Sequence, residues 1–219
     1  MLLQILTYTH HLTTMLFGIF LSAFFLGVKQ NKKNVCILLG GAAVSGLFFL
    51  ICNTVFGSLF TEAVYPIFVH LPLFLLLVFY YRFRWLPSII SIMTAYLCCQ
   101  FSNWAGIFAL SLSGLDWVYY LVRIIVTVAV FAFLSRYLCQ TTALLLAKSD
   151  RELYILGAMP FVYYVFDYST TKFSMLLYSG NKVVVEFLAF AMCISYVIFL
   201  FVYFQEYELK NRAEQYGQL

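Results

Sequence analysis

The chain has 219 residues, of which 64% are hydrophobic and only 10% are charged. Soluble domains carry about a quarter charged residues, so this composition excludes a free-standing water-soluble enzyme. With 11 glycines and 4 prolines, the chain is also unlike collagen or a disordered protein. These values indicate a protein that crosses a membrane several times. Seven spans of about 20 residues each would leave no stretch long enough for a soluble catalytic domain.

Seven apolar runs follow one another along the chain, separated by charged or glycine-containing connections. They are residues 12–28, 35–60, 63–81, 86–112, 117–138, 153–166 and 183–204. Each run predicts a membrane-spanning helix, and the run 153–166 is the shortest. The nearly unbroken apolar stretch 71–81 does not alternate as an outer-membrane strand does. We therefore predict an all-α, polytopic membrane protein with seven transmembrane helices.

Lysine and arginine are unevenly distributed over the connections between these runs. Ten basic residues fall on connections that would share one side of the membrane: Lys29, Lys32, Lys33, Arg82, Arg84, Arg136, Lys148, Arg151, Lys210 and Arg212. Lys172 and Lys182 fall on the other side. Arg123 lies in the middle of the run 117–138, whereas Arg136 lies at the end of that run, next to the connection. Because basic residues are retained in cytoplasmic loops, we predict that the N-terminus lies outside and the C-terminus is cytoplasmic.

Strongly polar residues within the predicted spans gather in the half that this orientation places outside. They are Asn53, His70, Gln100, Asn103, Arg123 and Glu186. The inner halves carry mainly Ser, Thr and Tyr. A transporter needs polar groups near the midplane with a route to both faces. The one-sided distribution instead favours a polar region open to the outside, as a receptor for an external ligand requires.

Arg123 is the basic residue that lies deepest inside a predicted span. Asp116 lies seven positions earlier on the same helical face, and Glu186 is expected at a similar depth on the last helix, so either carboxylate is a candidate partner. Arg123 therefore forms a structural ion pair, extends to the outer surface or contacts a ligand. For His70 and Asn103, two alternatives are likewise open, namely hydrogen bonding between helices and ligand contact.

Other chemistry finds no support in the sequence. The six cysteines fall in or at the ends of the predicted spans without metal-type spacing, which favours packing roles. No glycine-rich phosphate loop, zinc-binding helix motif or nucleophile elbow occurs. We therefore predict no catalytic residue, cofactor or metal site. The net charge of +4 arises from the predicted cytoplasmic loops, so it indicates attraction to membrane lipid rather than to nucleic acid.

The last predicted span continues into a polar helix, because residues 205–214 contain no Pro or Gly that would stop it. Glu208 and Arg212 also have the i,i+4 spacing of an ion pair. Residues 183–213 would extend about 46 Å, well beyond a hydrocarbon core of about 30 Å. We therefore divide the chain into a transmembrane domain, 1–204, and a cytoplasmic helical extension, 205–219. Leu209, Ala213 and Tyr216 have the spacing of a dimer seam; a solvated helical tail is the alternative.

Three segments carry a resemblance to a known family: MPFVYYVFDYSTT at 159–171, LYSGNKVVVEF at 177–187 and VYFQEYE at 202–208. Together they resemble the membrane-embedded sensor region of bacterial GHKL-type sensor histidine kinases. These two-component receptors are related to the quorum-sensing peptide receptors. The likeness covers residues 150–216 closely and the rest of the chain loosely.

The resemblance implies what should accompany this region. In that family, a cytoplasmic dimerisation helix with the phosphoacceptor histidine, and then an ATP-binding domain, follow the last span. His10, His11 and His70 are external or intramembrane under the predicted topology, so none suits that role. We therefore expect a homodimeric sensor module of the bacterial cytoplasmic membrane, without enzymatic activity of its own, whose kinase core is fused or separate.

Residues and resemblance together predict the input module of a two-component sensor histidine kinase. An extracellular small ligand or peptide would bind in the outer half, and the candidate residues are Arg123, Glu186, Asp167, Asp116, Asn103 and His70. The candidate signal-transmitting residues are Tyr207, Leu209, Ala213 and Tyr216. Movement of the last helix would carry the signal inward as a shift between two packings. A small polytopic transporter or channel-like membrane protein is the alternative.

Overall fold

The structure is a computed structural model that describes residues 2–57, 60–61, 64–172 and 182–217; side chains of residues 168–172, 182–187, 189, 211 and 214–217 are not described. Its elements are α1 (Leu2–Phe25), α2 (Lys32–Phe56), η1 (Pro66–His70), α4 (Leu71–Leu75), η2 (Leu76–Tyr80), α5 (Trp85–Cys98), α6 (Gln100–Ser113), α7 (Asp116–Tyr137), α8 (Cys139–Leu146), α9 (Asp150–Lys172) and α11 (Lys182–Gly217). No strand occurs among these residues, which confirms the predicted all-α class.

Four of the described helical segments are long and apolar enough to cross a membrane. They are Lys32–Phe56, Trp85–Ser113, Asp116–Tyr137 and Phe190–Lys210. Large apolar side chains on them are exposed, as lipid contact requires; Leu47 and Phe48 on α2 are 59% and 56% exposed. The runs predicted as the first, third and sixth spans correspond to α1, the short apolar helix Pro66–Tyr80 and α9, which do not belong to this set of four.

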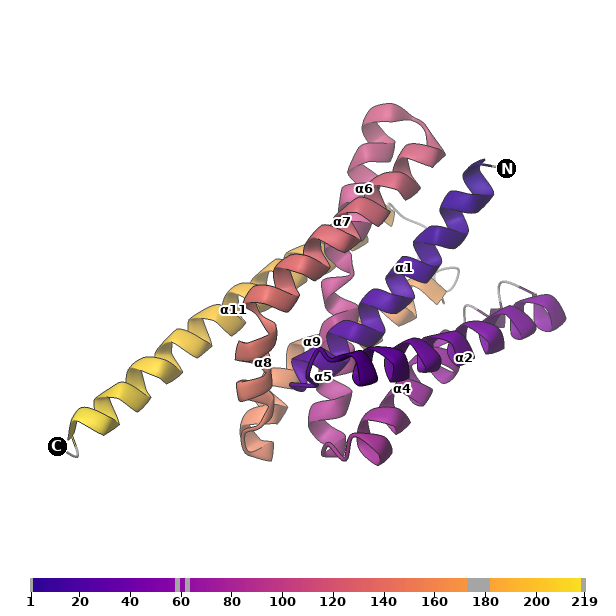
Figure 1. Cartoon of the computed structure of the whole chain (residues 1–219). Helices are drawn as coiled ribbons and strands as arrows, with labels where there is room; N and C mark the ends of the chain where they lie inside the picture. Colours follow the sequence, from indigo (N-terminus) through magenta and orange to yellow (C-terminus); the bar gives the residue numbers. More distant parts are fainter. Residues whose placement is uncertain (1, 58–59, 62–63, 173–181, 218–219) are drawn as a thin grey trace.

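Figure 1 shows how the helices are arranged around a central group. α1 packs against α5 and α7, α5 packs against α9, and α6 packs against α7. α2 and the segment η1–α4–η2 form a hairpin on one side of this group, while α11 packs against α6, α8 and α9. The start of α1 and the end of α11 lie at opposite ends of the molecule.

The segment Pro66–Tyr80 is an irregular helix because of its prolines. The Leu71 N–H donates to the carbonyl of Pro66, five residues earlier, rather than four. Pro72 has no N–H to donate to the carbonyl of Phe68, and such a loss favours the wider π-type turn. The third predicted span is therefore not a regular α-helix. This irregular turn ends at His70, which contacts side chains of α5 and α9.

The predicted span 86–112 divides at Cys99 into α5 and α6. There the Cys99 N–H donates to the carbonyl of Tyr96, only three residues earlier, at 3.1 Å, so the regular i→i−4 pattern is interrupted. α6 ends at Gly114, whose φ of +65° is a left-handed conformation that glycine adopts with little strain. The chain then reverses into α7.

α5 and α9 approach each other closely at a glycine. A Cβ atom added to Gly157 of α9 would lie 2.7 Å from the Cδ1 atom of Ile90 on α5, so a larger residue would force the helices apart. The buried side chains of Leu97 on α5 and Leu156 and Tyr163 on α9 continue this packing. The close contact brings side chains of α9 within reach of Tyr96.

The last helix, α11, is continuous over 36 residues, or about 54 Å at about 1.5 Å per residue. The prediction that this helix continues beyond Phe204 is confirmed. Arg212 and Glu208 form the predicted i,i+4 ion pair, with an N–O distance of 3.8 Å. Both side chains are more than half exposed, so the pair contributes little to stability.

Candidate functional site

His70 lies at the centre of a group of aromatic and acidic side chains from three helices, which we call the His70 cluster: His70, Tyr65, Tyr96, Tyr164 and Asp167. The Nδ1 atom of His70 and the hydroxyl of Tyr164 are 2.9 Å apart and hydrogen-bonded. The rings of Tyr65 and Tyr96 meet the imidazole edge-to-face, with centroids 5.4 and 5.7 Å away. Such offset geometry is favourable between aromatic rings.

Asp167 belongs to the same cluster through Tyr96. The hydroxyl of Tyr96 donates a hydrogen bond to Oδ2 of Asp167 at 2.6 Å, and the rings of Tyr96 and Tyr164 pack edge-to-face at 5.0 Å. The two predicted site residues His70 and Asp167, 97 positions apart in the sequence, are thus joined through two tyrosines. A polar group in a membrane protein is stabilised by such interhelical hydrogen bonds.

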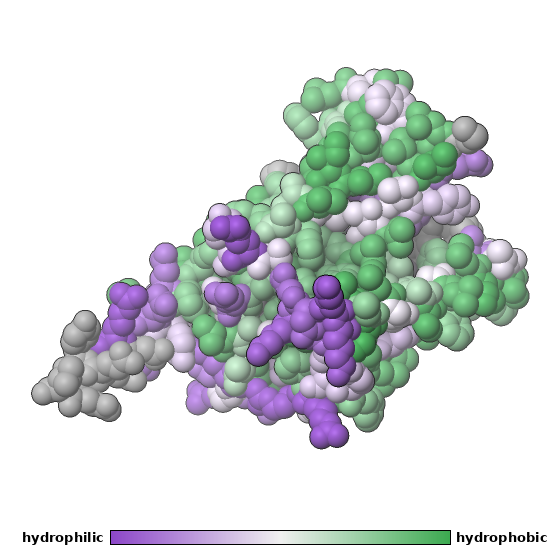
Figure 2. Space-filling view, viewed as in Figure 1, coloured by the Kyte–Doolittle hydropathy of each residue, from purple (hydrophilic) through white to green (hydrophobic). Residues whose placement is uncertain are grey.

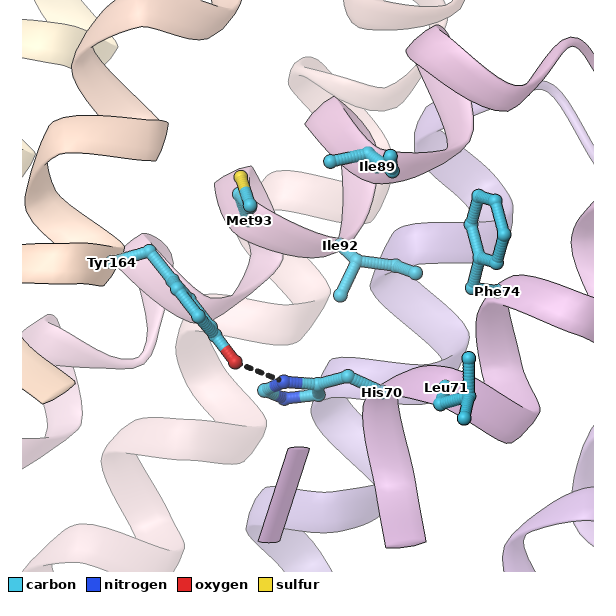
Figure 3. Close-up of a pocket in the computed structure, with 7 residues that line it drawn as sticks. All are labelled: His70, Leu71, Phe74, Ile89, Ile92, Met93 and Tyr164. Atoms are coloured by element: carbon cyan, nitrogen blue, oxygen red, sulfur yellow. Dashed lines mark hydrogen bonds between the residues drawn. The ribbon is translucent and has the colours of Figure 1, made fainter. Parts of the chain in front are cut away.

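A cavity of about 230 Å³ lies beside the His70–Tyr164 hydrogen bond. Its walls are Leu71, Phe74, Ile89, Ile92 and Met93, with His70 and Tyr164 at one end. Figure 3 shows the tip of the Tyr164 side chain directed at the imidazole, with the apolar side chains of α4 and α5 beyond it. The cavity therefore combines apolar walls with a polar end, as ligand sites commonly do.

Arg123 lies on α7 against α6. Its guanidinium donates a hydrogen bond to the hydroxyl of Tyr119, one turn earlier, and lies 5.1 Å from the centre of that ring. The aliphatic part of Arg123 covers Gly106, where an added Cβ would overlap Cγ and Cδ of the arginine. Nε of Arg123 is buried and, among the described residues, makes no hydrogen bond.

The other predicted site residues take different positions. Asp116 is exposed at the start of α7, and no ion pair joins it to Arg123, which bonds to Tyr119 instead. Asn103 donates to the side-chain oxygen of Gln100 on its own helix at 3.3 Å. Glu186 belongs to α11, but its side chain lies outside the described residues. The predicted pairing of Arg123 with Glu186 therefore stays a prediction.

A second polar group surrounds the side chain of Lys148, which is only 9% exposed. We call it the Lys148 cluster: Lys148, Glu152, Tyr203 and Tyr207. The ammonium of Lys148 lies 3.6 Å from the ring centre of Tyr207 and 4.8 Å from that of Tyr203, both on α11. It also lies 3.4 Å from the Glu152 carboxylate and 3.4 Å from the Tyr203 hydroxyl. One lysine ahead of α9 thus contacts α11 through two aromatic rings.

Arg84 connects the Lys148 cluster to the start of α5. Its Nη1 atom pairs with the Asp150 carboxylate at 2.7 Å, and its Nη2 atom donates to the backbone carbonyl of Lys148. The Arg84–Asp150 pair is about half exposed and so contributes little by itself. Its bond to the Lys148 carbonyl fixes the backbone that carries the lysine.

Glu152 also caps the N-terminus of α9. Its carboxylate accepts hydrogen bonds from the hydroxyl of Ser149 at 2.9 Å and from the Ser149 N–H at 3.3 Å. The hydroxyl hydrogen bond, with a smaller contribution from the Lys148 ammonium, lowers the pKa of Glu152 below its ordinary value of 4.5. Glu152 is therefore ionised at neutral pH beside Lys148.

Of the predicted signal-transmitting residues, Tyr207 contacts the rest of the protein through Lys148. Leu209, 66% exposed, and Ala213 are both exposed on α11, as a dimer seam requires of a single chain. The side chain of Tyr216 lies outside the described residues.

Sequence reasoning missed Lys148 and Tyr96. Lys148 was counted only as one of the basic residues that fix the orientation, although its i,i+4 spacing to Glu152 marked it as a paired side chain. Tyr96 lies in an apolar run, and its position opposite Asp167 follows from helix packing that no local pattern reveals.

No group of three or more His, Cys, Asp or Glu side chains that could hold a metal ion occurs among the described residues. Comparison of the chain with models of protein families, with curated proteins and with solved structures gave no match.

Proposed function

We propose that this chain is the membrane-embedded input module of a bacterial two-component sensor histidine kinase. The observation that carries the proposal is the contact between α11 and the Lys148 cluster. α11 extends about 54 Å, and Lys148 contacts Tyr203 and Tyr207 in its second half. A long helix that packs against α6, α8 and α9 and is contacted by a buried lysine in its second half is suited to transmit a movement beyond the membrane.

The proposal includes seven membrane spans, with the N-terminus outside and the C-terminus in the cytoplasm. Two observations support it. The ends of the chain lie at opposite ends of the molecule in Figure 1. In Figure 2, hydrophilic residues gather toward the end at which α11 emerges, while hydrophobic residues cover most of the rest of this face. This distribution agrees with basic loops on the cytoplasmic side.

The route for a signal runs along α9. Its Tyr164 and Asp167 belong to the His70 cluster, whereas its Glu152 belongs to the Lys148 cluster. An external small ligand or peptide that repacks the His70 cluster, together with Arg123, would shift α9. That shift would change the position of Lys148 against α11. The ligand acts by binding one of two packings more tightly than the other.

The output of the module is α11 itself. Leu209 and Ala213 are exposed, and in a homodimer they would face the same residues of the second copy. The ATP-dependent reaction belongs to a kinase core, fused or separate, that joins the cytoplasmic extension. The chain itself carries no catalytic role in this proposal.

A fusion of residues 1–219 to a heterologous histidine kinase core tests the proposal. Autophosphorylation in membrane vesicles should differ between the parent fusion and Lys148→Gln, which removes the ammonium from between the two rings. Lys210→Gln is the matched control, because it removes one exposed lysine from α11 without touching the contact between Lys148 and the two rings. Equal phosphorylation in all three fusions would contradict the proposal.

A liposome flux assay with the purified chain addresses the transporter alternative. A sensor module should pass no ion or solute across the bilayer. Coupled flux that disappears in Arg123→Ala would support a transporter and contradict the sensor proposal.

A further inference from the structure

A second cavity, of about 360 Å³, lies along α1 and α7, away from the His70 cluster. We call it the α1–α7 groove. It is lined by Thr13, Leu16, Phe17, Phe20, Phe24, Gln30, Val35, Thr127, Val128 and Phe131. The part lined by α1 extends from Thr13 to Phe24, about 16 Å at about 1.5 Å per residue. This is close to half of a hydrocarbon core of about 30 Å, so the groove has the length of one leaflet.

The walls of the groove present almost no free polar group. The hydroxyl of Thr13 donates to the carbonyl of Thr9, and that of Thr127 donates to the carbonyl of Arg123, both at 2.7 Å. Apart from Gln30, the remaining wall residues are apolar, and Phe131 packs against Phe17 and Phe24. Among the described lining residues, only Gln30 has polar side-chain atoms without an internal hydrogen bond. The groove is thus apolar along its length and polar at one end.

Positive charge gathers at that polar end. Lys29, Lys32 and Lys33 flank Gln30 in the sequence, and all three are exposed at the turn from α1 to α2. No acidic residue lies in the first turn of α2, and none of these lysines forms an ion pair within the described part of the chain. Three uncompensated ammonium groups next to an apolar groove match a molecule with an apolar tail and an anionic head.

We propose that the α1–α7 groove binds one acyl chain of an anionic phospholipid, with the lipid phosphate held by Lys29, Lys32 and Lys33 and by the amide of Gln30. The occupant is a lipid of the leaflet next to the α1–α2 turn. This site is separate from the proposed sensor function, because neither the His70 cluster nor the Lys148 cluster contributes to it.

Native mass spectrometry of the full chain in detergent tests the site, with phosphatidylglycerol and phosphatidylcholine of identical acyl chains as probes. The parent should retain phosphatidylglycerol preferentially. Each lysine near a phosphate contributes about fivefold to the affinity for an anionic lipid. The affinity of the triple variant Lys29→Gln, Lys32→Gln, Lys33→Gln for phosphatidylglycerol should therefore be about a hundredfold lower. The matched control, Arg136→Gln, Arg151→Gln, Lys210→Gln, removes three exposed charges elsewhere and should keep the preference.

Val128→Phe tests the groove itself. Val128 lines the groove and is 56% exposed, so a phenyl ring can occupy the groove without entering the buried core. Binding of both lipids should fall at least about tenfold. Unchanged binding in this variant would overturn the groove as the site of the acyl chain. If the control variant loses its preference for phosphatidylglycerol as fully as the Lys29, Lys32 and Lys33 variant does, the proposed headgroup site is overturned.

Discussion

The ammonium of Lys148 lies 3.6 Å from the ring centre of Tyr207, between the start of α9 and the second half of α11. Lys148→Gln should therefore weaken the packing of α11 against the start of α9. The loss of interaction free energy should be about 1–2 kcal/mol, the range of a largely desolvated cation–π contact. Lys148→Arg should retain most of this interaction free energy, because a guanidinium also packs on aromatic rings. Double electron–electron resonance between spin labels at positions 144 and 210 measures the effect. The distance distribution should broaden in Lys148→Gln only.

The hydrogen bond between Tyr96 and Asp167 couples α5 to α9. Tyr96→Phe and Asp167→Asn should each lower the free energy of unfolding, and the double variant should lose less than the sum. A coupling of about 1 kcal/mol is expected for a hydrogen bond between membrane helices. SDS titration in mixed micelles measures it. Tyr154→Phe, on a side chain of α9 that is 61% exposed, is the control and should change little.

Gly106 provides the space that Arg123 fills. Gly106→Ala should displace the arginine stem and destabilise the protein by about 1–3 kcal/mol, as overpacking does. Gly18→Ala is the matched control, since nothing lies within 4 Å of the added Cβ, and alanine favours a helix. Thermal unfolding in detergent compares the two. A midpoint for Gly106→Ala at or above that of Gly18→Ala would contradict this packing.

Glu152 should give the protein an acid-sensitive contact. Folding lowers the pKa of Glu152 below its ordinary value of 4.5. Ionised Glu152 therefore adds to the free energy of unfolding above pH 4.5, and this addition is lost as the pH falls through the folded-state pKa. The midpoint of thermal unfolding, measured from pH 7 to about pH 3.5, should decrease below about pH 4.5, and this decrease should be smaller in Glu152→Gln. The control is Glu206→Gln, on the exposed extension, which should follow the parent curve.

The proposed topology predicts which positions a membrane-impermeant maleimide reaches in intact cells. A single cysteine at position 172 should react from outside, whereas single cysteines at positions 32 and 151 should react only after the membrane is opened. The background variant lacks the six native cysteines. The reverse pattern of labelling would contradict the orientation.

The sequence predicted the helical class and the continuous last helix, because both follow from local patterns. Apolar runs, and the lack of Pro or Gly in residues 205–214, were sufficient for α2, α7 and α11. It did not predict the π-type turns around Pro72 or the break at Cys99. Those features depend on the pattern of backbone hydrogen bonds within an apolar run, and the hydropathy of the residues carries no information about that pattern.

The candidate site was predicted only in part. His70 was singled out as a costly polar residue in an apolar run, and Asp167 as a ligand-site candidate directly after the run 153–166. The structure joins the two through Tyr164 and Tyr96. Lys148 was not singled out, because a basic residue in a loop gives the same signal whether it is solvated or buried. Its 9% exposure arises from packing against α11, which lies 55 positions further along the chain.

The dependence of α9 on α5 has a consequence for biogenesis. α9 does not belong to the set of helices apolar enough to cross a membrane by themselves, yet it carries Asp167 to a partner on α5. During synthesis, α5 leaves the ribosome long before α9. In the proposed seven-span topology, α9 should therefore enter the membrane only after the earlier helices have assembled and α5 is in place to pack against it.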